Sequence, residues 1–429
     1  MTNGSVKIVA FYEEGISASA AASRISTSEG TALDAYAKSG NREKDLKLIG
    51  KVLSSGHNTV IEHAQITVAF NNVSVLCEQL IIEHRLAAYT VKSRRYVDFT
   101  GAGYIIPENL GEDETAFKAH MDGLFNVYSH LLELEIPKED ARFVLPYCFR
   151  SNFIMTANAR EFAYLAGTMT VGRLSAYPEM VYLGNMLTRQ LEERFPGIMK
   201  AYTRKAPDAE PIFAPDTIEN ACEARQEVRL VASAPNAKAL IEAALALEGK
   251  DASLKALVKS ERPRALEMLS YTFKVSDVSL ACVTHFTRHR IQSLIVPSPA
   301  HALKQNAYVL PESIRQNAEA LKIYIRAFET NAAFARKFID RPEIISYFAL
   351  AGNTVDILFN MNARELLHFL RLRTCTRAQW EIRDAAREML MLLTEEYPEL
   401  FKFYGPSCAV LGYCPEGRLS CGKIQKAGE

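Results

Sequence analysis

The chain has 429 residues and carries 50 basic and 50 acidic side chains, so its formal net charge is zero at pH 7. This balance gives no overall field that would attract nucleic acid or an anionic membrane, so we expect neither as a partner. The chain lacks both an apolar run of about 18 residues and the pattern of a secretory signal, and we expect a cytoplasmic protein.

Three short strings occur twice, in the same order and 204 or 205 residues apart: 83–85 with 288–290, 104–108 with 308–312, and 158–161 with 362–365. Three collinear matches indicate an internal duplication. The sequence therefore predicts two domains, 1–205 and 206–404, and a tail rich in cysteine and glycine at 405–429. Pro207, Pro211 and Pro215 indicate a linker between the domains.

Each copy begins with the same pattern of elements. Alternating apolar residues predict strands at 65–70 and 271–275, and helical spacing follows at 73–88 and 278–291. The tripeptides 83–85 and 288–290 are then expected in the last turn of a helix. Loops are expected at 89–99 and 294–303, and the prolines within 296–299 argue against helix there.

The third repeated string opens another helix. Arg364, His368 and Leu372 recur every four residues and form one stripe, and Asn362 is well placed to cap the helix. A longer amphipathic helix is expected at 378–397.

In the first copy the corresponding helix begins at Asn158, and Gly167 and Gly172 weaken its continuation. Helices mixed with a few alternating strands, without a regular strand-helix rhythm, predict an α+β fold.

Arginine clusters are the main chemical signal. The glycines at 101 and 103 do not complete a dinucleotide fingerprint, and no phosphate-loop string or two-histidine metal pattern is present. Guanidinium groups bind phosphates and carboxylates in bidentate fashion at any working pH. The alternative interpretation is that these arginines cap helix ends and pair with surface glutamates.

Three cysteines lie in the tail, at Cys408, Cys414 and Cys421. With a fourth ligand they could hold a metal, and two of them could form a disulfide. The other interpretation is an exposed tail without a metal, and we assign no metal ligands.

Motifs in both copies resemble the flavin-dependent thymidylate synthases. In the first copy these are 56–59, 62–63, 84–85, 93–96, 141–146 and 158–160. In the second copy they are 288–293, Ser298, 362–364, 372–373 and 378–382. The resemblance covers nearly the whole chain outside the tail.

This resemblance implies two tandem copies of that family's α+β fold, an antiparallel sheet flanked by helices. It implies FAD as cofactor, a homotetrameric assembly, and active sites built from more than one subunit. The implied reaction is reductive methylation of dUMP to dTMP, with methylenetetrahydrofolate as methyl donor and NADPH as reductant of the flavin.

The resemblance also implies roles for individual residues. Arg373 would be catalytic and would polarise the uracil, a contribution worth roughly 3 kcal/mol. The residues expected to bind substrate are Ser93, Arg95, Arg142 and Arg288. The residues expected to bind the cofactor are Thr59, Arg288, His289, Arg290, Asn362, Arg364 and His368.

Neither copy carries the family pattern complete. The first copy has Glu83 in place of the leading arginine and Met169 in place of the catalytic one. The second copy has Ala300 and Ser346 where two further arginines are expected. Because these losses are complementary, we predict composite sites that draw on both copies, and a homodimer that acts as a pseudo-tetramer.

Three functions remain open. The first is the synthase reaction at composite sites. The second is flavin-dependent modification of another pyrimidine nucleotide, because Val91, Val296 and His285 replace residues that the family carries near the base. The third is a non-catalytic flavin- or nucleotide-binding protein, which the four substitutions above favour.

Overall fold

The structure is a computed structural model that describes residues 4–202, 211–249 and 252–424. The chain forms two compact units: unit 1 comprises Met1–Ile218 and Asn317–Leu350, and unit 2 comprises Glu219–Gln316 and Ala351–Glu429. The predicted boundary at 205/206 and Pro207 of the linker lie outside the described residues. The segment 317–350 belongs to the second copy in sequence, yet it packs with unit 1.

Unit 1 contains a four-stranded antiparallel sheet in the order β1-β2-β4-β3. Its strands are β1 (Ser5–Phe11), β2 (Gln65–Ser74), β3 (Ala88–Val91) and β4 (Arg150–Asn158). Its helices are α1 (Gly15–Ile25), α2 (Ala32–Ala37), α3 (Arg42–Ser54), α4 (Val75–Ile82), α5 (Glu114–Glu133), α6 (Lys138–Ala141), α7 (Ala159–Thr170), α8 (Pro178–Arg194), α14 (Ala318–Ala335) and α15 (Pro342–Ile345). Helices α7 and α8 pack on each other, and α8 packs on β1.

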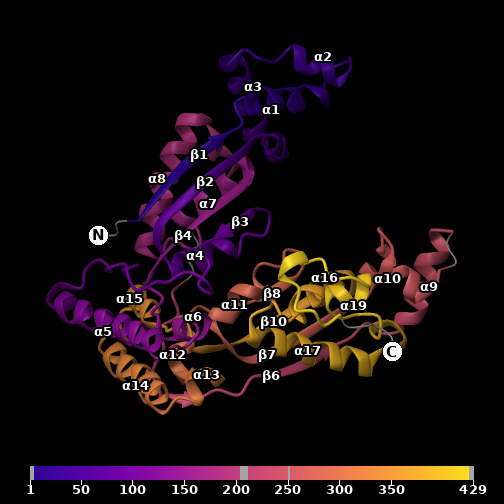
Figure 1. Ribbon diagram of the computed structural model, residues 1–429. Helices are drawn as coiled ribbons and strands as arrows, with labels where there is room; N and C mark the ends of the chain where they lie inside the picture. The colour runs from indigo at the N-terminus through magenta and orange to yellow at the C-terminus, as the bar shows by residue number, and fades with distance from the viewer. Residues whose placement is uncertain (1–3, 203–210, 250–251, 425–429) are drawn as a thin grey trace. The chain divides into compact units, whose positions relative to one another are not determined.

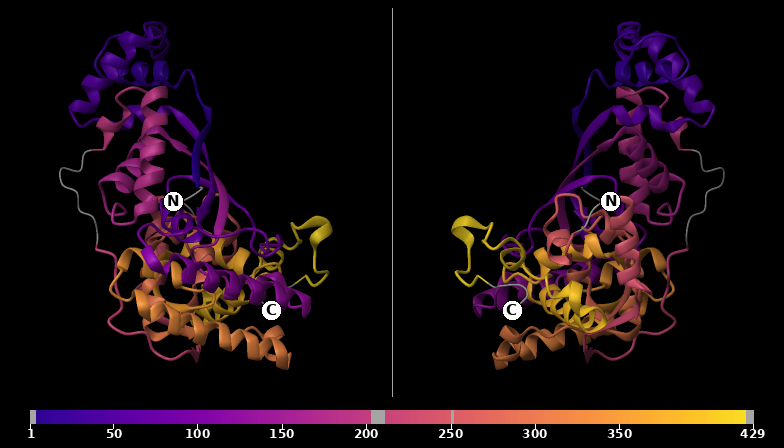
Figure 2. Two further views of the ribbon diagram at one scale, coloured as in Figure 1. Left: turned by 90° about the vertical axis from the view of Figure 1, so that its left-hand side faces the viewer. Right: turned by 90° about the vertical axis from the view of Figure 1, so that its right-hand side faces the viewer.

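Helix α14 completes unit 1 by packing alongside α5, as Figures 1 and 2 both show. A ring nitrogen of His120 lies 3.0 Å from the amide oxygen of Asn331. The hydroxyl of Tyr347 donates to the buried carboxylate of Glu179 over 2.8 Å. These polar contacts help to hold a segment of the second copy in the same unit as the first.

Unit 2 repeats the same sheet in the order β6-β7-β10-β8. Its strands are β5 (Cys222–Glu223), β6 (Glu227–Ala232), β7 (Ser270–Ser279), β8 (Ser293–Ile295), β9 (Ala307–Tyr308) and β10 (Thr354–Asn362). Its helices are α9 (Ala237–Leu247), α10 (Leu254–Lys259), α11 (Leu280–Phe286), α12 (Ala300–Gln305), α13 (Glu312–Arg315), α16 (Ala363–Arg373), α17 (Trp380–Glu396), α18 (Pro398–Phe401) and α19 (Ser407–Leu411). The predicted α+β class and the repeated antiparallel sheets are confirmed.

Both central strands carry the same irregularity. Asn72 in β2 and Asp277 in β7 have positive φ angles of 50° and 54°. Asn and Asp adopt this left-handed conformation more readily than other residues with a side chain. The duplication therefore extends to the backbone conformation of single residues.

The predicted helices at 73–88 and 278–291 are too long, since α4 ends at Ile82 and α11 at Phe286. Both tripeptides consequently lie just after a helix and not in its last turn. Side chains supply the missing donors: the Gln292 amide donates to the carbonyl of Phe286, and the Tyr89 hydroxyl donates to that of Ile81. Such donors satisfy terminal carbonyls and allow the helix to end early.

The two predicted loops are also partly ordered. The first contains all of β3 except Ala88, and the second contains the end of β8 and the start of α12 at Ala300, directly after the last proline. Helix α7 continues past Gly167 to Thr170. Among the described residues no helix has the length and apolar character needed to cross a membrane. The three tail cysteines are free thiols, with Cys408 in α19.

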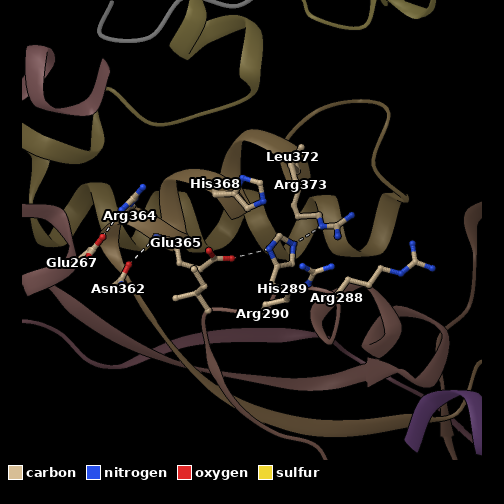
Figure 3. A pocket seen from close by; sticks show the side chains of 11 residues that line it. Glu267, Arg288, His289, Arg290, Asn362, Arg364, Glu365, His368, Leu372 and Arg373 are labelled. Carbon is tan, nitrogen blue, oxygen red and sulfur yellow. Dashed lines mark hydrogen bonds and ion pairs between the residues drawn. The ribbon is translucent and has the colours of Figure 1, made fainter. Parts of the chain in front are cut away.

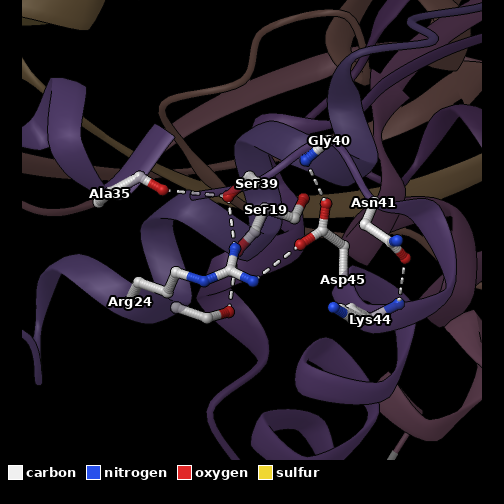
Figure 4. A network of polar contacts seen from close by, with 9 residues as sticks. Ser19, Arg24, Ala35, Ser39, Gly40, Asn41, Lys44 and Asp45 are labelled. Carbon is white, nitrogen blue, oxygen red and sulfur yellow. Dashed lines mark hydrogen bonds and ion pairs between the residues drawn. The ribbon is translucent and has the colours of Figure 1, made fainter. Parts of the chain in front are cut away.

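An ion pair between a half-buried arginine and a buried carboxylate connects the N-terminal helices α1 to α3 of unit 1 (Figure 4). The Arg24 guanidinium lies 2.9 Å from the carboxylate of Asp45, which has no exposed surface, and it also donates to the hydroxyl of Ser39. The second carboxylate oxygen of Asp45 accepts from the backbone N–H of Gly40 over 2.7 Å. Asp45 thus contacts both α1, through Arg24, and the turn before α3, through Gly40.

We expect Arg24→Ala to lower the free energy of unfolding by about 3 kcal/mol, because it leaves a buried carboxylate without its counter-charge. Urea denaturation would measure the change. Lys51→Ala, at an exposed position of the same group of helices, should alter stability by less than about 0.5 kcal/mol. Equal effects of the two variants would show that the buried pair contributes no more than a surface residue.

Candidate functional site

Four arginines of the second copy line a pocket of about 810 Å³ in unit 2 (Figure 3). The lining comes from the segment after α11, from the end of β10, from α16 and from the 3-10 helix Arg264–Met268 before β7. The residues are Glu267, Arg288, His289, Arg290, Ile291, Asn362, Arg364, Glu365, His368, Leu372 and Arg373. Seven of these were predicted as site residues from sequence: Arg288, His289, Arg290, Asn362, Arg364, His368 and Arg373.

Helix α16 presents most of these side chains, and its first turn is fixed by a cap. Asn362 ends β10 in an extended conformation, and its side-chain oxygen accepts from the backbone N–H of Glu365 over 2.9 Å. The predicted cap is therefore confirmed. The guanidinium of Arg364 forms an ion pair with Glu267, which anchors this arginine at the pocket edge.

The His289 ring lies at the centre of a buried polar chain. The side chain of His289 is only 3% exposed, and its Nδ1 lies 3.0 Å from Oε1 of Glu365. Its Nε2 lies 3.1 Å from Nε of Arg373. The neighbouring residues Arg288 and Arg290 are exposed, so this segment alternates between one buried ring and two accessible cations.

Burial is the main cause that lowers the pKa of His289 to about 2, and the positive charge of Arg373 acts in the same direction. His289 is therefore neutral at any working pH. Burial also raises the pKa of Glu365. In Figure 3 the His289 ring stands between Glu365 and Arg373, with His368 on the adjacent turn of α16.

Arg373 is held from two sides. Besides the contact with His289, its terminal Nη2 donates to the backbone carbonyl of His285 over 3.2 Å. The side chain is half-buried and lines the pocket. A fixed guanidinium at the wall of a partly enclosed pocket can stabilise negative charge that develops on a bound ligand.

The remaining predicted site residues belong to unit 1, where contacts bring Ser93, Arg95 and Arg142 together but do not include Thr59. The hydroxyl of Ser93 accepts from the backbone N–H of Arg95 over 3.3 Å. Both predicted arginines meet one acidic residue: Arg95 pairs with the Glu139 carboxylate at 2.8 Å, and Nε of Arg142 donates to the Glu139 carbonyl at 3.0 Å. Arg142 is buried, and Thr59 lies exposed in the 3-10 helix Asn58–His63.

The first copy retains the histidine but surrounds it differently. His84 is buried, its ring lies 5.5 Å from that of Tyr164, and burial lowers its pKa to about 3. Met169 occupies the position of Arg373 and has no exposed surface. Glu83, in place of the leading arginine, lies 3.3 Å from Arg173.

Two acidic residues of the pocket, Glu267 and Glu365, had no role in the sequence analysis. Both have a counterpart in the first copy, where Glu62 pairs with Arg160 at 2.5 Å and Glu161 follows the same cap. Because both glutamates occur at equivalent positions of the two copies, a comparison of the copies would have identified them.

The lowered pKa values of the buried histidines His84 and His289 predict how stability depends on pH. Below pH ~6.5 the unfolded chain binds protons at both rings and the folded chain does not. The free energy of unfolding therefore decreases as the pH is lowered, by up to about 1.4 kcal/mol per pH unit for each ring. His84→Gln should flatten this decline between pH 6.5 and 5, as measured by urea denaturation.

The control is His130→Gln. Glu133 and Glu319 raise the pKa of His130, so protonated His130 adds stability at low pH and its removal should steepen the decline. An unchanged slope for His84→Gln would show that His84 takes up protons in the folded chain.

Comparisons with known proteins agree with the internal duplication of the sequence. The family model described as "Thymidylate synthase complementing protein" matches residues 7–197 and 217–399. The predicted tandem repeat of one family domain is therefore confirmed.

Relatives named "Flavin-dependent thymidylate synthase" include one from Clostridium tetani, 37% identical over 37% of this chain and 71% of its own length. Another, from Nitratidesulfovibrio vulgaris, is 34% identical over 43% of this chain and 80% of its own length. A UMP/dUMP methylase of known structure from Streptomyces cacaoi, bound with 5-Br dUMP, is 20% identical with a TM-score of 0.39, over 49% of this chain and 99% of its own.

Proposed function

The chain belongs to the thymidylate synthase complementing protein family, and we propose that it is a flavin-dependent enzyme that methylates dUMP to dTMP. In this proposal methylenetetrahydrofolate donates the methyl carbon, NADPH supplies the reducing equivalents, and FAD carries them. The observation that carries the proposal is Arg373, whose guanidinium is fixed by His289 and by the His285 carbonyl at the wall of the unit 2 pocket.

The pocket fits a flavin nucleotide on physical grounds. Its volume of about 810 Å³ lies within the usual range for sites that enclose ligands of this size. The exposed guanidinium groups of Arg288 and Arg290 stand at its rim and match the charge of phosphate groups. Bound there, FAD would supply hydride transfer, which no side chain can perform.

The protein's own contribution is charge and placement. Arg373 would face the pyrimidine carbonyl and stabilise the negative charge that develops when the base becomes a nucleophile at carbon 5. His289 is neutral and both of its ring nitrogens contact the protein, so it does not serve as the acid or base of this step. Arg364 is held at the far edge of the pocket by Glu267.

The complete site is composite in this proposal. Unit 1 contributes Ser93, Arg95 and Arg142 around the nucleotide, and Thr59 near the flavin. Unit 2 contributes the pocket itself. The second copy offers no substitute for the unit 1 arginines, because Ala300 and Ser346 stand at their positions and both are fully buried.

The position of His285 favours a second candidate, the same chemistry on another pyrimidine nucleotide. This residue, whose carbonyl contacts Arg373, stands where the resemblance leads one to expect glutamine. A changed side chain next to the residue that would contact the base can alter which base is accepted.

The first test is the visible spectrum of the purified protein, followed by anaerobic reduction with NADPH and addition of dUMP with methylenetetrahydrofolate. We expect flavin absorbance, reoxidation dependent on dUMP, and formation of dTMP. A reduced flavin that does not respond to dUMP but does respond to another pyrimidine nucleotide supports the second candidate. Protein that binds no flavin would overturn both.

Arg373→Ala should lower kcat for dTMP formation by roughly 100-fold to 1,000-fold, the usual effect of removing one donor that stabilises developing charge. The matched control is Met169→Leu, at the equivalent position of the first copy, which conserves volume in a buried site and should leave kcat unchanged. Comparable losses in both variants would contradict the assignment of catalysis to the second copy.

Arg95→Ala should also abolish activity if unit 1 completes the site, whereas Arg189→Ala on the exposed side of α8 should have no effect. Co-refolding the inactive Arg95→Ala and Arg373→Ala chains then tests the assembly. If each site draws on two chains, mixed dimers contain one intact site and regain part of the activity. If each site is built within one chain, the mixture would regain no activity. Full activity of Arg95→Ala would refute the composite site.

A further inference from the structure

We propose that Glu365 and His289 are positioning residues: Glu365 fixes the tautomer of His289, and that ring in turn orients the guanidinium of Arg373. The chain of contacts runs from Oε1 of Glu365 to Nδ1 of His289 at 3.0 Å, and from Nε2 of His289 to Nε of Arg373 at 3.1 Å. The catalytic consequence rests on the proposed function. The contacts between Glu365, His289 and Arg373 do not depend on that function.

Hydrogen-bond chemistry determines the direction of the chain. The Nε of arginine carries a proton at any working pH and can only donate, so Nε2 of His289 must be the acceptor. A neutral imidazole that accepts at Nε2 carries its proton at Nδ1. That proton points to Glu365, whose carboxylate is the acceptor that stabilises this tautomer.

Burial makes this arrangement specific. His289 is 4% exposed and Glu365 is 7% exposed, so solvent does not readily replace either partner. A lost hydrogen bond there leaves a buried polar group without its partner, which is costly. Glu365 is itself held, because its backbone N–H donates to the Asn362 cap at the start of α16.

The chain of contacts also changes the role expected for His289. Sequence resemblance assigned this residue to the cofactor, yet both ring nitrogens are directed at protein groups. The exposed neighbours Arg288 and Arg290 remain directed at the pocket. His289 therefore acts through Arg373 and not by a polar contact with the flavin.

The first copy provides an internal comparison. It keeps both upstream residues, Glu161 and His84, but Met169 replaces the arginine. The Nε2 atom of His84 is buried and has no hydrogen-bond partner among the residues that the structure describes. Removing the arginine thus leaves its acceptor unused, as expected if the ring's Nε2 serves that arginine.

The test uses the full-length chain with histidine labelled with ¹⁵N, because ¹⁵N chemical shifts report which ring nitrogen carries the proton. His289→Gln identifies the resonances. We expect the Nδ1–H tautomer for His289 in the wild type and in Glu365→Gln, whose amide oxygen still accepts. In Glu365→Leu we expect a shift toward the Nε2–H tautomer, which cannot accept from Arg373.

The same variants are then assayed for dTMP formation. Glu365→Leu should lower kcat by on the order of 10-fold to 100-fold, by analogy with the loss of partners that orient metal-binding histidines, with a smaller change in KM. Glu365→Gln should recover much of this loss. A merely structural role predicts lower thermal stability with kcat and tautomer both unchanged, and that result would overturn the proposal.

The two proposals fail in distinguishable ways. If the chain does not methylate dUMP, the tautomer of His289 and its response to Glu365→Leu still test the positioning role in the protein without ligand. If dTMP is formed and Arg373→Ala abolishes it, but Glu365→Leu keeps the Nδ1–H tautomer and full kcat, only the positioning role is wrong.

Discussion

A buried serine-glutamate contact at the end of the central strand anchors each unit. In unit 2, Glu381 of α17 accepts from both the backbone N–H and the hydroxyl of Ser279, at 2.7 and 2.5 Å. The same hydroxyl caps α11 by accepting from the N–H of Cys282. Ser74 and Glu179 repeat these contacts in unit 1. Because the contact fixes where α11 begins, it also determines where the segment 288–291 emerges beside α16.

The two copies show how one scaffold supports different sites. The caps at Asn158 and Asn362, and the ion pairs of Arg160 and Arg364, are the same in both. The differences lie at the end of the helix that follows. In the first copy the ring of Tyr202 occupies the space where Gly167 lacks a side chain, since an added Cβ would lie 2.3 Å from it. The second copy has Arg371 and Arg373 on the corresponding turn. In the first copy this turn of the helix thus serves packing, whereas in the second copy it carries two positively charged side chains.

Local patterns predicted the elements that carry the site. The duplication, the cap at Asn362, the helix that it opens and the helix expected at 378–397 could be predicted because each depends on neighbouring residues. The structure has these helices at Ala363–Arg373 and Trp380–Glu396. The early ends of α4 and α11 could not, since they depend on donors outside the helical pattern, such as the Gln292 amide. The packing of α14 with unit 1 depends on contacts between distant residues, which periodicity does not report. The role proposed for Glu365 could not be predicted from sequence, because a glutamate in the first helical turn already has a common local explanation.

The pocket's positive charge makes the neutrality of His289 a structural requirement. A protonated ring would donate from both nitrogens, could not accept from Arg373, and would repel it at close range in a poorly solvated site. Burial and the arginine itself prevent protonation by lowering the pKa to about 2. The same cation that must be oriented therefore helps to keep its acceptor in the form that can orient it. This mutual dependence holds the guanidinium in one position across the working pH range through a neutral acceptor, which leaves the charge that the proposed chemistry uses.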